Sequence, residues 1–494
     1  MIAIVAVAAE VALILVGGAA RAEAFSWDRI GAHLARSGFG GGVLVVVVVG
    51  MAGMLAPLRS WPRQRWTLAL AAFLLHLPFV HVPQAQPDTV FWFTLAQHIA
   101  RDPVATLSQW SAVAWGAEQG RYHHPLPGVP VVYALAYAVF GESHVVSDIV
   151  MTLVAVAIPL AVADLGEARS PRTGAAAGWL SLGVPFVAAQ SGWMLADLPL
   201  LLVVTLAWSG FAHRRNRPAA IVAALLIKPA AVLWLIAPWA FATRRRLWLL
   251  APFVAALWLS PPRSHSVETY LGGIVATVIV LRPSLWVAAA GCLRGDRLDR
   301  LVHGGALVLL PLALWAPPDH LARYALPAVS LLAVAGTRLP FALQRGIVAS
   351  GIAFLLLGYR PIVADTQAAN IGAAVRAIEA EGVDSIDVIS DMPGTSFTGA
   401  ALTALVDYEA RVPVRFAGAL GVGTSQSKRH WWQDWQAPPW ASGPPSRGVL
   451  LAVYGGNANA LAGDADLARI GTISHFRGSS ALLPREIVLY RRVR

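Results

Sequence analysis

The sequence predicts an all-α polytopic membrane protein, with about 11–13 transmembrane helices and a small C-terminal α/β domain outside the cytoplasm. Composition is the first observation behind this fold class. Only 13% of the 494 residues are charged and 57% are hydrophobic, with a mean hydropathy of +0.60. Soluble globular proteins carry about 25% charged residues, and disordered chains are much less hydrophobic. The single cysteine, Cys292, excludes an intrachain disulfide and zinc sites made of cysteine clusters.

The uneven distribution of charge is the second observation. Residues 1–360 contain 26 basic and 15 acidic residues, whereas residues 361–494 contain 12 of each and lack long apolar runs. We therefore expect a boundary near Arg360. The predicted parts are extra transmembrane helices over 1–65, a membrane domain over 66–360 and a soluble α/β domain over 361–494.

Apolar runs are the third observation, since a spanning helix needs about 20 mostly apolar residues. The first run carries Glu10 and lacks a basic n-region, so we interpret it as a retained helix rather than a signal peptide. The candidate spans are residues 2–19, 41–58, 66–82, 145–163, 174–191, 197–212, 247–260, 267–292, 302–316, 324–337 and 346–359.

Clusters of arginine orient these spans, because basic loops remain in the cytoplasm. This topology explains the net charge of +11 without nucleic acid as a partner. It places the loop 83–125 and the tail 361–494 outside. The six clusters are Arg59/Arg63/Arg65, Arg169/Arg172, Arg214/Arg215/Arg217, Arg244/Arg245/Arg246, Arg294/Arg297/Arg300 and Arg338/Arg345.

Two apolar stretches do not fit this topology as single spans. Both ends of 218–243 lie inside, so Pro229 is expected to break it into a short hairpin with Lys228 at its tip. Both ends of 126–140 lie outside, and this stretch would be only about 22 Å long as a helix. It is expected to be re-entrant or to lie along the surface, unless the parity of the spans differs there.

The outer loop is predicted to form two helices over the outer leaflet. Asp88 begins an apolar helix, either as its cap or as a functional acid. Asp102, followed by proline, is the expected N-cap of the second helix. Trp92, Trp110 and Trp115 suit a membrane interface better than a substrate-stacking role. The histidine pair of this loop has no acidic neighbours, so it is weak evidence for a metal site.

Ionisable residues at membrane depth are costly and often mark function. Lys228 is one of only two lysines in an arginine-rich chain. This favours a compact ammonium at a phosphate oxygen over a snorkelling side chain. Asp197 either caps its helix or faces a site. The candidates are Glu10, Asp148, Asp197, Lys228, Glu268, Arg282 and, at an outer boundary, Arg323.

Four of the ionisable residues share the outer face in this topology: Asp88, Asp197, Lys228 and Arg323. Two acids and two bases at one membrane face suit a phosphorylated substrate that a lipid carries.

Four segments, in this order, resemble the GT-C superfamily of polyprenyl-phosphate-sugar-dependent glycosyltransferases. The similarity is greatest to protein-mannosyltransferase-like, aminoarabinose-transferase-like and lipid A galacturonosyltransferase-like members, and it covers roughly residues 66–340. Each segment is weak alone, but their order is fairly specific. The segments are PDTVFWFTLAQHIA, YHHPLPGVPVVYALAYAVFGES, LADLPLLLVVTLAW followed by ALLIKPAAVLWL, and RYALPAVSLLAVAG.

The resemblance implies an integral membrane glycosyltransferase of the bacterial inner membrane. It would move a sugar from a polyprenyl-phosphate donor to an extracytoplasmic hydroxyl of an unidentified acceptor, with inversion. Asp88 would be the catalytic base, and Lys228 and Arg323, with the adjacent Tyr324, would hold the donor phosphate. Supporting or substrate-binding roles are implied for Asp197, His123, His124 and Trp92.

The sequence departs from the family pattern in three respects. Thr89 stands where many relatives have a second acid, and His124-Pro125-Leu126-Pro127 replaces the usual His-Pro-Pro-Leu. Two helices also precede the family's usual first helix. These differences leave the identity of the sugar and the use of a divalent cation open. The sequence itself requires no cofactor.

Three other classes of protein remain open. They are a polytopic transporter or lipid flippase, an O-antigen ligase or polymerase, and a non-catalytic scaffold that binds through its tail. The lack of an inverted internal repeat argues against a transporter, as does the gathering of acids at one face rather than at the midplane.

The tail is expected to form an amphipathic helix, NIGAAVRAIEAEG, and the strands SIDVIS, GVLLAVYG and REIVLYRR. Its glycine-rich GALGVGTS lacks the lysine of a nucleotide-binding loop. Its tryptophan-rich SKRHWWQDWQAPPW is a candidate for contact with the membrane or an acceptor.

Overall fold

The structure is a computed structural model of the chain. The predicted spans 2–19 and 247–260 lie outside the residues that it describes, as do His123, His124 and the side chain of Asp88. Glu10, Trp110, Trp115, Glu268 and the tail segment 427–440 also lie outside them. The described residues are 39–77, 87–108, 127–189, 196–243, 271–315, 321–363, 367–390, 406, 410–412, 414–419, 449–454, 467–474 and 486–492, with gaps at 216, 229, 272, 276, 279–280 and 292–294.

The chain divides into two compact units. The first unit comprises residues 1–80, 125–129 and 148–361. The second unit comprises residues 81–124, 130–147 and 362–494. The outer loop therefore belongs to the same unit as the tail, and one division falls at the end of the predicted membrane domain.

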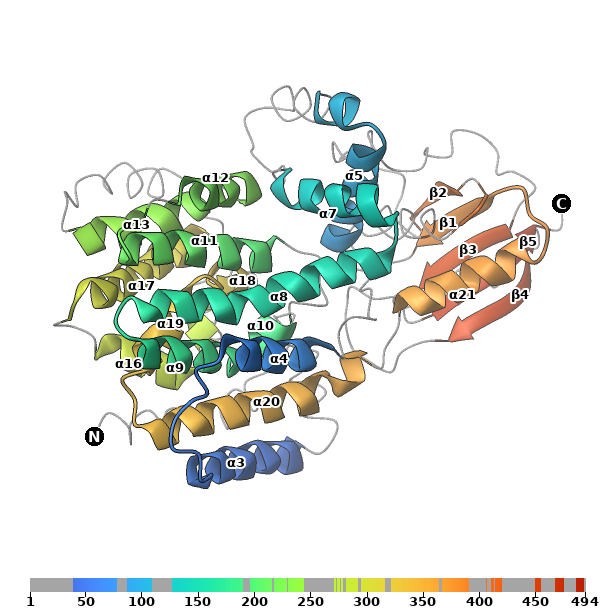
Figure 1. Ribbon diagram of the computed structural model, residues 1–494. Helices are drawn as coiled ribbons and strands as arrows, with labels where there is room; N and C mark the ends of the chain where they lie inside the picture. Colours follow the sequence, from blue (N-terminus) through green and yellow to red (C-terminus); the bar gives the residue numbers. More distant parts are fainter. Residues whose placement is uncertain are drawn as a thin grey trace. The chain divides into compact units, whose positions relative to one another are not determined.

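The first unit is built of helices (Figure 1). Among the described helices, only Val145–Glu167 is long and apolar enough to cross a membrane by length and composition, and six further apolar helices have 10–17 residues. The helices lying wholly or largely in this unit are α3 (Phe39–Leu55), α4 (Arg65–His76), α8 (His144–Glu167), α9 (Pro171–Leu182), α10 (Pro185–Ala189), α11 (Asp197–Ala212), α12 (Pro218–Ile227), α13 (Ala231–Thr243), α16 (Pro283–Ala290), α17 (Arg297–Trp315), α18 (Leu321–Tyr324), α19 (Ala328–Gly336) and α20 (Phe341–Val363).

The helices of the first unit differ in how much apolar surface they expose. All residues of α19 are buried, so this helix lies in the core. By contrast, Met51 of α3, Leu74 of α4, Leu153 of α8 and Val222 of α12 are each more than half exposed. A soluble monomer rarely exposes apolar side chains over so many neighbouring helices, and such surfaces suit contact with lipid tails.

Three predicted spans are wrong because each is broken. Residues 174–191 divide into α9 and α10 at Gly183, and a proline begins α10. Residues 267–292 break at Arg282, whose φ of 71° is left-handed, and a proline follows. Residues 324–337 divide into α18 and α19, again at a proline. Proline removes a backbone donor and favours the first turn of a new helix, so each apolar run continues as two pieces.

The break predicted within 218–243 is confirmed. α12 ends at Ile227, Lys228 has extended backbone with φ −156° and ψ 134°, and α13 begins at Ala231. The residue before a proline is disfavoured in helical conformation, which explains the extended Lys228. α12 and α13 contact each other, and both contact α11 (Figure 1).

The stretch 126–140 forms α7 (Gly128–Phe140), whose 13 residues span about 20 Å. A Cβ at Gly128 would lie 2.7 Å from the carbonyl oxygen of Leu226. Glycine therefore allows the first turn of α7 to approach the end of α12. The depth of α7 in the membrane stays a prediction.

The second unit contains a five-stranded sheet with the order β2-β1-β3-β5-β4. β1 is parallel to β2 and β3, whereas β5 is antiparallel to β3 and β4. α21 contacts β5 and lies against the sheet in Figure 1. The unit also holds α5 and most of α7. The elements are α5 (Pro87–Arg101), α21 (Gln367–Glu379), β1 (Ile386–Ser390), β2 (Val414–Ala419), β3 (Val449–Tyr454), β4 (Leu467–Ser474) and β5 (Glu486–Arg492).

The helix and the three strands expected in the tail are confirmed as α21, β1, β3 and β5. The sequence did not predict β2 and β4, whose segments VRFAGA and LARIGTIS each include a glycine. Glycine lowers β-propensity, and the register of β4 shifts between Arg469 and Gly471. Partners in the sheet therefore stabilise these two strands more than their own sequences do.

Candidate functional site

A buried carboxylate at the start of α11 holds two cations. Asp197 lies in the first turn of α11, one residue after the N-cap Ala196. Its carboxylate is fully buried. One oxygen accepts from Lys228 Nζ at 2.6 Å and the other from Arg323 Nε at 3.0 Å. Asp197 thus bonds to side chains of two other segments, and its role in a functional site stays a prediction.

Lys228 reaches Asp197 because of the break between α12 and α13. Its extended backbone ends α12 and carries the ammonium to the start of α11. The ammonium also lies 4.0 Å from the ring centroid of Tyr324, where the aromatic face attracts a cation. One of the three N–H groups of the Lys228 ammonium thus donates to Asp197, and the aromatic face of Tyr324 stabilises the positive charge.

Arg323 and Tyr324 come from α18, the single helical turn that precedes the proline break before α19. Lys228 is 31 residues from Asp197 along the chain, and Arg323 is 126 residues from it. The site therefore assembles from three elements that are brought together only by the packing of the first unit.

Two tryptophans of the core position α18 and α13. Trp234 donates from Nε1 to the carbonyl oxygen of Tyr324 at 3.0 Å. Trp208 of α11 donates from Nε1 to the carbonyl oxygen of Trp234 at 2.8 Å, and the two rings meet edge to face at 6.0 Å. Both indoles are buried. Their two hydrogen bonds therefore link α11, which carries Asp197, to α13, which follows Lys228, and to α18, which carries Arg323.

The two cations of this cluster share one carboxylate. Asp197 pairs with Lys228 and with Arg323 in a site of low dielectric constant. The side chains of Lys228 and Arg323 are 16% and 15% exposed, whereas that of Asp197 is 0% exposed. The carboxylate thus lies beneath the cations and orients them.

The other residues implicated by the sequence lie in the second unit. Asp88 lies in the first turn of α5, as predicted, but its side chain is outside the described residues. Trp92 is 6% exposed on the buried face that Leu95 and Ile99 continue, so it packs against protein rather than lipid. This burial argues against Trp92 as an interface anchor. Asp102 accepts from the Ala105 backbone N–H at 3.0 Å, which confirms it as an N-cap.

The segment Phe-Gly-Glu-Ser has a structural role that the sequence did not predict. Glu142 makes two hydrogen bonds with Arg101 of α5, at 2.9 and 2.7 Å. Gly141 has a φ of 86°, a conformation that glycine adopts readily. Ser143 accepts from the backbone N–H of Val146 at 3.2 Å, so it caps α8. The segment therefore ties the end of α5, the helix that begins with Asp88, to the start of α8.

Two other charged residues at membrane depth have no place in this cluster. Arg282 donates from Nη2 to the carbonyl oxygen of Ile347 at 3.0 Å and to Ser350 Oγ at 2.6 Å, so it links α16 to α20. Asp148 of α8 is buried. Within the described part of the chain, no group of three or more His, Cys, Asp and Glu side chains is placed to hold a metal ion.

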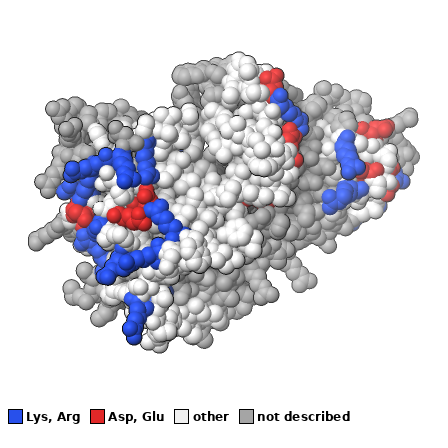
Figure 2. Space-filling view, in the orientation of Figure 1, with Lys and Arg blue, Asp and Glu red and all other residues white. Residues whose placement is uncertain are grey.

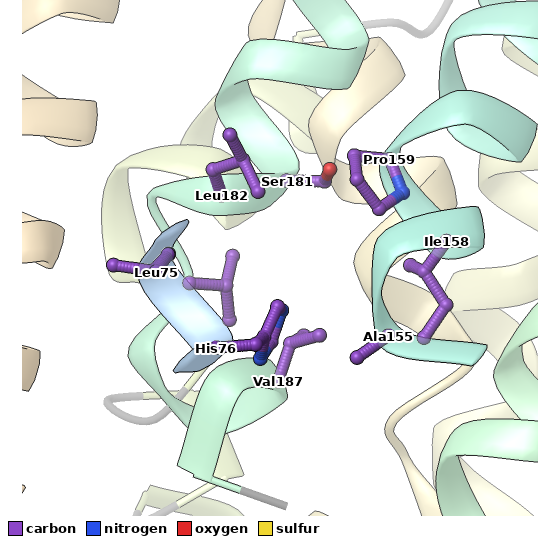
Figure 3. Close-up of a pocket in the computed structure, with 9 residues that line it drawn as sticks. Leu75, His76, Ala155, Ile158, Pro159, Ser181, Leu182 and Val187 are labelled. Atoms are coloured by element: carbon purple, nitrogen blue, oxygen red, sulfur yellow. The ribbon is translucent and has the colours of Figure 1, made fainter. Parts of the chain in front are cut away.

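A small cavity lies elsewhere in the first unit (Figure 3). Its volume of about 10 Å³ is the size of one water molecule. The side chains of His76, Ile158 and Ser181 point toward it from α4, α8 and α9. A cavity of this size cannot hold a sugar.

The fold of the chain is similar to that of two solved structures of one protein, which agrees with the resemblance in the sequence at the level of the fold. The chain is similar to ArnT from Cupriavidus metallidurans, solved bound to undecaprenyl phosphate, with a TM-score of 0.52 and 13% identity over 86% of this chain and 97% of that one. The apo state of the same ArnT gives a TM-score of 0.51 with equal identity and coverage. No protein-family profile and no curated protein matches the chain.

Proposed function

We propose that the protein is an integral membrane glycosyltransferase that uses a sugar linked to a polyprenyl phosphate. The observation that carries this proposal is the pair of cations, Lys228 and Arg323, held over the buried Asp197. The ammonium of Lys228 and the guanidinium of Arg323 suit the phosphate of such a donor. The fold supports it, because ArnT shares that fold and was solved with undecaprenyl phosphate.

The two cations have complementary roles in this proposal. Lys228 and Arg323 bind the phosphate of the donor, and Tyr324 holds the ammonium in place. Asp197 is a positioning residue, because it orients both cations from below without reaching the donor. As the bond between the anomeric carbon and the phosphate oxygen breaks, the electron pair stays on the phosphate. The cations stabilise that growing negative charge in a site that excludes water.

Asp88 is the proposed base. Its carboxylate accepts the proton of the acceptor hydroxyl while the hydroxyl oxygen attacks the anomeric carbon. The new bond forms on the face opposite the departing phosphate, so the configuration inverts. The phosphate leaves as a stable anion and needs no proton from the protein.

The topology follows from the arginine clusters. With the basic loops in the cytoplasm, the site and the tail lie at the outer face of a bacterial inner membrane. The acceptor is then an extracytoplasmic molecule with a free hydroxyl. Trp92, His123 and His124 belong to the outer loop, which is proposed to contact the substrates.

Substitution of the two lysines tests the phosphate site. Lys228→Ala should weaken the binding of undecaprenyl phosphate about 10- to 100-fold, the value of a charge-assisted hydrogen bond. Lys428→Ala, which removes the only other lysine, should leave binding unchanged. Native mass spectrometry of the purified protein with added undecaprenyl phosphate measures both. Equal affinity in the two variants would mean that Lys228 does not hold the phosphate.

Substitution of two acids of the outer loop tests the base. Asp88→Asn should lower the rate of sugar transfer by about 100-fold or more while leaving the binding of undecaprenyl phosphate intact. Asp102→Asn is the matched control, because Asp102 serves as a helix cap. The assay follows transfer from a polyprenyl-phosphate sugar to lipid acceptors by mass spectrometry. Near-normal turnover by Asp88→Asn would exclude it as the base.

A further inference from the structure

The basic end of the first unit contains arginines whose charge is matched by carboxylates. Figure 2 shows acidic side chains enclosed by basic ones at this end. Arg169 makes two hydrogen bonds with Asp296, at 2.8 and 2.9 Å, and a third with Asp299 at 2.6 Å. The other pairs described at this end are Arg65 with Glu167 and Asp164, Arg217 with Asp164, and Arg338 with Asp299.

Three other arginines at the same end form a cluster without such partners. Arg297 and Arg300 lie one turn apart at the start of α17, and Arg214 follows the end of α11. Among the described residues, none supplies a carboxylate to these three guanidinium groups. The adjoining sequence contains further arginines, since Arg244–Arg246 follow α13 and Arg294 precedes α17. The neighbouring acids Asp296 and Asp299 pair with other arginines, Arg169 and Arg338.

The cluster also contains buried donors that the protein leaves unsatisfied. Within the described residues, Nε of Arg297, Nε of Arg300 and Nε2 of His303 are buried and have no hydrogen-bond partner. Burial lowers the pKa of Arg297, and the positive charges of Arg214 and Arg300 lower it further. Like charges and unpaired donors both disfavour the folded state in isolation, so the cluster is arranged for an anion.

The backbone at Arg214 gives an independent indication. Arg214 has a φ of 58°, in the left-handed region, and Arg215 N donates to the carbonyl oxygen of Gly210 at 2.8 Å to close the end of α11. Glycine is the usual residue at this position of a helix terminus, because a Cβ is strained there. An arginine at a strained position points to a use for its side chain.

We propose that Arg214, Arg297 and Arg300, with His303, bind the headgroup phosphate of an anionic phospholipid from the leaflet at this end of the membrane. A phosphate offers several acceptor oxygens to guanidinium groups, and basic pockets between helices on the cytoplasmic side bind anionic headgroups. The site follows the last residue of α11, whereas Asp197 begins that helix. The 16 residues of α11 separate the two by about 24 Å, so the sites are distinct.

Lipid binding by a double variant tests the site. The full chain in detergent is titrated with phosphatidylglycerol or phosphatidylcholine, and the lipid-bound fraction is measured by native mass spectrometry. Arg297→Gln/Arg300→Gln should weaken the binding of phosphatidylglycerol about tenfold or more, since each basic residue at a membrane surface contributes a factor of about five. Phosphatidylcholine binding should not change.

The matched control removes two other arginines of the same end. Arg59 and Arg63 are exposed, so Arg59→Gln/Arg63→Gln should bind phosphatidylglycerol within about twofold of the wild type. Equal loss in the two double variants would overturn the proposal, because binding would then follow net charge rather than this site. If inorganic phosphate alone raised the melting temperature of the protein as much as phosphatidylglycerol does, the proposal would also be overturned. The site would then bind a soluble anion.

A variant with the opposite effect on stability guards against misfolding. Arg214→Gly relieves the backbone strain and one repulsive charge, so it should raise the melting temperature in lipid-free detergent. It should also reduce the rise in melting temperature that phosphatidylglycerol produces. A full rise with phosphatidylglycerol in Arg214→Gly would remove Arg214 from the site.

Discussion

Asp197 has more influence on the site than its position at a helix start suggests. A carboxylate at the first turn favours a helix through the macrodipole, and this one also bonds to Lys228 and Arg323. Because it is fully buried, removal of its charge would take away the carboxylate that Lys228 and Arg323 share. The residue therefore determines the stability of the fold as well as the geometry of the cations.

Asp197→Asn should lower the free energy of unfolding by about 3–5 kcal/mol, the cost of breaking a buried ion pair on one side. The double variant Asp197→Asn/Lys228→Met should recover part of this loss, because it also removes one of the unpaired charges. Thermal unfolding in detergent measures both proteins. If the double variant is as unstable as the sum of its single variants, the two side chains do not interact.

Asp296 makes the stability of the folded state depend on pH. The two hydrogen bonds from Arg169, together with those from the backbone N–H groups of Asp299 and Leu298, lower the pKa of Asp296 from 3.8 to about 2. A depressed pKa stabilises the folded state above the unfolded value and loses this effect as pH falls from about 4 toward 2. The melting temperature of the wild type should therefore fall more steeply over this interval than that of Asp296→Asn. Parallel pH profiles would show that the pair does not stabilise the fold.

At the scale of the elements, small residues set how closely the helices pack. α13 carries Trp234, whose indole holds α18, and α13 lies against α17. A Cβ at Gly304 of α17 would lie 2.6 Å from Pro238 Cα, which is backbone. At Gly305 a Cβ would meet the Cδ1 end of Leu331 at 2.2 Å, and that side chain can move. A larger residue is therefore tolerated less well at Gly304, where it meets backbone, than at Gly305, where it meets a movable side chain.

Gly304→Ala should separate α13 from α17 and lower the free energy of unfolding by about 1–3 kcal/mol, the usual cost of overpacking. Gly305→Ala should cost less, because helix propensity favours alanine by about 1 kcal/mol and Leu331 can adjust. The shift in melting temperature measures both, and the binding of undecaprenyl phosphate reports whether α18 has moved. A larger loss in Gly305→Ala would contradict this account of the packing.

At the scale of the whole molecule, the proposed function depends on orientation. The positive-inside rule predicts that the basic clusters lie in the cytoplasm, and the only cysteine, Cys292, lies two residues before Arg294 of one cluster. The tail would then lie outside. The native cysteine therefore provides a direct measure of topology.

A membrane-impermeant maleimide should label Cys292 in inverted vesicles but not in intact spheroplasts. In a Cys292→Ser background, a cysteine introduced at the exposed Asp384 of the tail should show the reverse pattern. Gel-shift of the labelled protein measures each case. The same pattern for both positions would place the tail on the cytoplasmic side and exclude the proposed outer-face reaction.

Local signals in the sequence were enough for much of the architecture. The span 197–212 coincides with α11, and proline after Lys228 predicted the break that the structure shows, because both depend on residues close in the chain. The wrong spans have the same origin: hydropathy does not register a backbone break inside an apolar run. Composition and apolar runs predicted a mostly helical chain, whereas the roles of the candidate residues came from the family resemblance and stay predictions.

Only the tertiary structure decided which charges meet. The sequence left Asp197 as either a cap or a site residue, and its partners are 31 and 126 residues away. The arginines at the basic end look alike in sequence, yet packing pairs Arg169 with two carboxylates and leaves Arg297 with none among the described residues. The physical reason is that electrostatic contacts depend on distance in space, which helix packing sets and local sequence does not.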